Sequence, residues 1–143
     1  MTVTRALSAL VLMLVTWSSV LLITWWLIGD VSYPGGSDQI LSLPTLEEQA
    51  GPLALAGLVG LVASVSIAMF VLAQRRRWKR MALAMCMAAV TGVWCGFSLR
   101  VISSRTDGAN IGGSALTFVA PGPSLLLLSI AAAVAFDAIN QAN

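Results

Sequence analysis

Few side chains in this chain could carry out chemistry, and they are not grouped. The sequence contains no histidine, which removes the imidazole ligands of many metal and haem sites and the commonest acid–base catalyst. The cysteines Cys86 and Cys95 lie in one predicted helix, about 13 Å apart along its axis. A disulfide needs Cα atoms roughly 4.4–6.8 Å apart, so we expect two buried thiols that pack as small apolar groups.

Four carboxylates fall in one polar stretch: Asp30, Asp38, Glu47 and Glu48. Their spacing matches no calcium-binding loop, and we interpret them as part of a solvated surface. The glycine pair at 112–113 lacks the following lysine and the strand-to-helix setting of a phosphate-binding loop. The sequence therefore predicts no catalytic residue, no cofactor and no metal site.

Composition predicts a membrane protein. Of 143 residues, 58% are hydrophobic and 10% are charged, against roughly 25% charged in an ordinary soluble domain. Apolar runs of about 20 residues, the length needed to cross a bilayer, occupy 6–28, 53–73, 81–102 and 119–139. We predict an all-α bundle of four transmembrane helices that forms a single membrane domain, residues 1–143.

Charge sorting predicts the orientation. Five of the eight basic residues lie in the turn 74–80 between the second and third spans: Arg75, Arg76, Arg77, Lys79 and Arg80. Short connections rich in Lys and Arg stay cytoplasmic, which places both termini in the cytoplasm and the connections 29–52 and 103–118 outside. An anionic-lipid site is the alternative interpretation of the basic turn. No basic stripe suggests nucleic acid, and the preference for Arg over Lys suggests a GC-rich bacterium, hence its plasma membrane.

The first outer connection has local features of its own. Thr45 and Glu48 match a capping box, which predicts a short surface helix that Gly51 and Pro52 then end. Pro123 is predicted to be the first helical residue of the fourth span.

Two ionisable residues fall inside the spans. Arg100 lies near the outer end of the third span, so we expect its guanidinium to reach the headgroups and to pair with Asp30. Asp137 lies near the cytoplasmic end of the fourth span, within reach of Arg75, Lys79 or Arg80. A substrate or ion path is the alternative role for both, because charges inside a membrane are often functional.

Small residues recur every four positions on two spans. They are Ala56, Gly60, Ser64 and Ala68 on the second, and Ala84, Ala88, Gly92 and Gly96 on the third. Such stripes let helix backbones approach closely. We expect the second and third spans to pack on each other as an antiparallel hairpin, with docking onto another protein as the alternative.

Trp17 and Trp94 fall near mid-membrane rather than in an interfacial belt. An indole N–H needs a hydrogen-bond acceptor there, so these side chains are candidate contacts with a partner, although packing inside the bundle would also explain them.

These observations predict a non-enzymatic accessory subunit that packs against a larger bacterial membrane complex and stabilises it or helps it assemble. Its partners would be the lipid bilayer and another integral membrane protein. One alternative is a small oligomeric transporter or channel, with Thr16, Ser18, Ser19 or Thr91 lining the path. Another is a sensor or regulator that uses the first outer connection.

Overall fold

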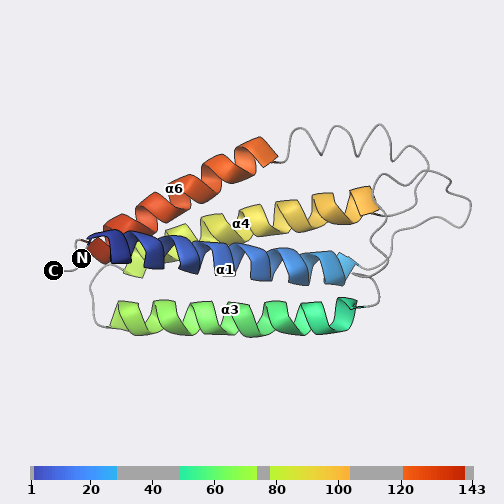
Figure 1. The fold of residues 1–143 in the computed structure, drawn as a ribbon, viewed down its shortest axis with the longest axis horizontal. Coiled ribbons are helices and arrows are strands. Elements are labelled where there is room, and N and C mark those ends of the chain that lie inside the picture. Colours follow the sequence, from blue (N-terminus) through green and yellow to red (C-terminus); the bar gives the residue numbers. More distant parts are fainter. Residues whose placement is uncertain (1, 29–48, 74–77, 104–120, 141–143) are drawn as a thin grey trace, which may run out of the picture.

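The computed structural model describes residues 2–28, 49–73, 78–103 and 121–140. The helices in these ranges are α1 (Thr2–Ile28), α3 (Ala50–Ala73), α4 (Trp78–Ser103) and α6 (Pro121–Asn140). They run in alternating directions along one bundle, so the start of α1 and the end of α6 lie at the same end (Figure 1). All four are long and apolar enough to cross a membrane, which indicates a multi-pass membrane protein.

The predicted spans coincide with these helices, with differences of a few residues at their ends. α3 includes Gly51 and Pro52, which were expected to lie at or before its start. Proline is tolerated there because the first N–H groups of a helix have no intrahelical acceptor, and the Leu53 N–H donates to the Gln49 carbonyl over 2.9 Å. The predicted surface helix after Thr45 lies outside the described residues.

Prolines also occupy the first turn of α6. It includes Pro121 two residues before Pro123, the predicted first helical residue. Each proline removes a backbone N–H that would otherwise lack a partner in the first turn.

α1 is the central helix of the bundle. It packs on α3, α4 and α6, and α4 also packs on α6, whereas α3 touches α4 only slightly. The expectation that the second and third spans pack on each other is therefore wrong. A stripe of small residues shows that a helix can be approached closely, but it does not identify the helix that approaches.

The buried core lies towards the end of the bundle that holds the start of α1 and the end of α6. Its members on α1, α3 and α4 are Ala9, Leu12, Met13, Ala68, Met81, Ala84 and Ala88, and those on α6 are Leu128, Ala131, Ala135 and Ala138. The three alanines of α6 bring this helix close to α1 and α4. Towards Pro121 the facing residues are leucines, and α6 diverges from its neighbours (Figure 1).

Candidate helix-packing and docking surfaces

The closest helix contact lies between α1 and α4, at the two glycines of the G-x-x-x-G motif. A Cβ atom added to Gly92 would lie 2.7 Å from the Trp17 carbonyl oxygen, and one added to Gly96 would lie 2.6 Å from that of Leu21. Real Cβ atoms essentially never approach so closely. The absence of a side chain at these positions is thus what allows the two backbones to meet.

The opposite side of α1 receives α3. A Cβ on Gly57 would lie 3.0 Å from the Ser19 carbonyl oxygen, and one on Gly60 would meet the Ser19 hydroxyl. Ser64 and Ala68 are buried further along this face, whereas Ala56 is exposed. The stripe that packs therefore begins at Gly57, which the four-residue spacing missed because helical neighbours also recur every three residues.

Arg100 is buried in the structure. Only 5% of its surface is exposed, and its guanidinium carbon lies 5.1 Å from the centre of the buried Trp25 ring, a cation–π distance. The structure thus places the Arg100 side chain against the aromatic face of Trp25 on α1, and contact with headgroups stays a prediction. Its predicted partner Asp30 lies outside the described residues.

At the other end of the bundle, Asp137 of α6 pairs with Arg80 of α4. The Arg80 Nη1 donates to Asp137 Oδ2, and Arg80 is one of the three partners considered from the sequence. The two side chains are 51% and 40% exposed, so the pair links two helix ends without contributing much stability. Lys79 is exposed, and Arg75, Arg76 and Arg77 lie outside the described residues.

Three hydroxyl groups of α1 and α4 donate hydrogen bonds to carbonyls of their own helices. Thr16 donates to the Leu12 carbonyl over 2.8 Å, Ser18 to that of Val15, and Thr91 to that of Ala88 over 2.9 Å. They are three of the four hydroxyl groups predicted as candidate lining of a transport path; the fourth, Ser19, is buried against α3. The protons of the first three are already committed to backbone acceptors of the same helix, so these three groups do not form a chain of polar groups through the bundle.

The two thiols differ in their surroundings. Cys95 is partly buried, and its thiol donates to the Ser124 hydroxyl of α6 over 3.3 Å. Cys86 is exposed at the bundle surface, which contradicts the expectation that both thiols are buried. The described residues contain no group of three or more His, Cys, Asp or Glu side chains able to hold a metal ion.

The two central tryptophans, Trp17 of α1 and Trp94 of α4, lie on different surfaces of the bundle. Trp17 is partly buried, and its Nε1 atom is buried with no hydrogen-bond partner among the residues that the structure describes. Trp94 is 45% exposed and lies in a shallow groove of about 600 Å³ between α1 and α4. We call this the Trp94 surface; its residues are Thr24, Ile28, Ala89, Val90, Val93, Trp94 and Phe97.

Comparison with known proteins found no matching family model, no matching curated protein and no matching solved structure.

Proposed function

We propose that this protein is a non-enzymatic accessory subunit that binds another integral membrane protein through the Trp94 surface, in a bacterial plasma membrane with both termini in the cytoplasm. The observation that carries the proposal is the position of Trp94. It lies nine residues before the end of α4 at Ser103, about 13 Å along the axis. This depth is inside the hydrocarbon region, where no water is present to pair with polar groups.

The surroundings of Trp94 support docking of a helix. Val90, Val93 and Phe97 project from the same side of α4 and are largely exposed. The indole N–H of Trp94 has no acceptor among the described residues. A partner helix that carries a hydroxyl, amide or carboxyl group at this level would pair with the N–H and cover the aromatic rings.

The transporter alternative has less support, because three of the four hydroxyl groups proposed to line a path, those of Thr16, Ser18 and Thr91, are bonded within their own helices. The sensor alternative depends on the first outer connection, of which the structure describes only residues 49–52.

The docking proposal is tested by purifying the tagged chain from its native membranes in a mild detergent. We expect a stoichiometric membrane protein to co-purify, and Trp94→Ala to reduce its recovery at least tenfold. Phe70→Ala is the matched control, because Phe70 is an exposed aromatic residue on α3, away from the Trp94 surface. Equal losses in both variants would contradict the docking surface.

A second measurement separates a subunit from a transporter. The purified chain alone in liposomes should conduct no ion or solute. Flux that Arg100→Gln or Asp137→Asn abolishes would overturn the proposal.

The orientation is tested with single cysteines in a Cys86→Ala, Cys95→Ser background. Gln49 precedes α3 and Lys79 lies at the start of α4, and both are exposed. In intact cells, Gln49→Cys should react with a membrane-impermeant maleimide and Lys79→Cys should not. The reverse pattern would contradict cytoplasmic termini.

A further inference from the structure

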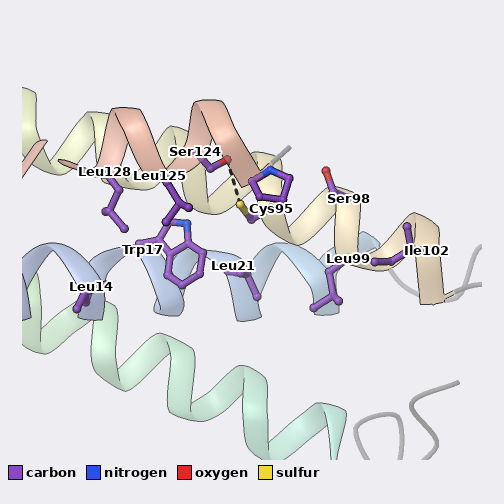
Figure 2. Close-up of a pocket in the computed structure, with 11 residues that line it drawn as sticks. Leu14, Trp17, Leu21, Cys95, Ser98, Leu99, Ile102, Ser124, Leu125 and Leu128 are labelled. Atoms are coloured by element: carbon purple, nitrogen blue, oxygen red, sulfur yellow. Dashed lines mark hydrogen bonds between the residues drawn. The ribbon is translucent and has the colours of Figure 1, made fainter. Parts of the chain in front are cut away.

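A second groove lies on another side of the bundle, where α6 diverges from α1 and α4. Its volume is about 430 Å³, within the range of small-molecule sites. The groove is lined by Trp17 and Leu21 of α1, Cys95 and Leu99 of α4, and Ser124 and Leu125 of α6 (Figure 2). None of the described residues that line this groove is charged, so this lining suits a neutral molecule.

The side chains that line this groove include hydrogen-bond donors. Cys95 and Ser124 share a single hydrogen bond, so one proton of the pair has no acceptor among the described residues. Ser124 is 95% buried, since only 5% of it is exposed. The Nε1–H of Trp17 is a second buried donor that finds no acceptor in the described part of the chain. By contrast, the Ser98 hydroxyl is paired, because it donates to the Trp94 carbonyl over 2.8 Å.

Both donors belong to residues that line this groove, although the Trp17 Nε1 atom is covered in the structure. Figure 2 shows the nitrogen-bearing edge of the Trp17 indole turned towards α6, next to Leu125. Leu125 is mostly exposed on the outside of the bundle, so a rotamer change can uncover Nε1. A ligand would therefore make its polar contacts between α1 and α6 and its apolar contacts with leucines on all three helices.

We propose that this groove binds a neutral, lipid-soluble molecule that carries a carbonyl oxygen on an apolar body, with Ser124 and Trp17 as hydrogen-bond donors. Cys95 lies eight residues before Ser103, about 12 Å from the end of α4. A ligand whose carbonyl oxygen reaches this depth must carry that oxygen on a group small enough to enter the hydrocarbon region. The ester of a membrane lipid and the ring of an isoprenoid quinone share this chemistry. The site is independent of the Trp94 surface.

The test uses a full-length variant in which Trp17 is the one remaining tryptophan, purified in an alkyl maltoside, which contains no carbonyl group. Two probes are titrated separately: a benzoquinone with a decyl tail, and a diacyl phospholipid with brominated chains. Each quenches indole fluorescence at close range. We expect saturable quenching by one of them, and the probe that saturates identifies the source of the carbonyl.

Ser124→Ala should weaken the apparent affinity of that probe by about three- to tenfold, which is the effect of losing one hydrogen bond. Ser129→Ala is the matched control, because Ser129 is an exposed serine of α6 whose hydroxyl donates to the Leu125 carbonyl. It should leave the affinity unchanged. Circular dichroism confirms that each variant is folded. Quenching that never saturates, or an affinity that Ser124→Ala does not change in a folded protein, would overturn the proposal.

Discussion

Gly96→Leu is expected to destabilise the bundle by about 3 kcal/mol, at the upper end of the usual cost of overpacking. The first atom of the new side chain would lie 2.6 Å from the Leu21 carbonyl oxygen and 2.9 Å from Thr24 Cβ. The nearest obstacle is backbone of α1, which cannot rotate aside, so α1 and α4 must separate and lose van der Waals contact along their length. Thermal unfolding in detergent micelles, followed by circular dichroism, measures the effect.

Two other glycines provide controls for this prediction. A Cβ on Gly122 would meet no atom within 4 Å, so Gly122→Leu should leave stability nearly unchanged. Gly60→Ala should cost less than Gly96→Ala, because the nearest atom to the new methyl group is the Ser19 hydroxyl, which can change rotamer. If Gly96→Leu unfolded at the wild-type temperature, the close approach of α1 and α4 would be contradicted.

The sequence predicts the four helices well because length and apolar composition suffice to identify membrane-spanning segments. It also identifies Gly92 and Gly96 as positions where backbones meet. It does not identify the partner helix. The predicted small-residue stripes lie on the second and third spans, yet the glycines of both stripes contact α1. Every helix in a membrane is apolar on all sides, so hydrophobic periodicity carries little information about which faces meet.

The groove beside α6 illustrates what a sequence does not show. The change from alanines to leucines along α6 is visible in the sequence, but the resulting divergence depends on the width of the facing surface, which Trp17 and Cys95 contribute from two other helices. The position of Arg100 likewise depends on a contact with another helix, which the sequence does not identify. Its depth suggested that it could extend outward, whereas the ring of Trp25 on a neighbouring helix offered a closer interaction.

The contact between Trp25 and Arg100 is expected to be a major determinant of stability at the Ile28 end of α1. Trp25 is 2% exposed, so Trp25→Ala removes a large buried side chain, which usually costs about 3–5 kcal/mol. It also removes the aromatic face that stabilises a buried guanidinium, a contribution of about 0.5–2 kcal/mol. Trp25→Phe keeps an aromatic face and removes an indole N–H for which the described residues supply no acceptor, so it should cost under about 1.5 kcal/mol.

A double-mutant cycle isolates the stacking contribution. Unfolding free energies are measured in the same detergent for Trp25→Leu, Arg100→Met and the double variant. Because the guanidinium stacks on the ring at 5.1 Å, we expect the two single costs to sum to more than the cost of the double variant, with a coupling of about 1 kcal/mol. Additive costs would show that Trp25 stabilises the bundle through its volume alone, with no contribution from the charge of Arg100.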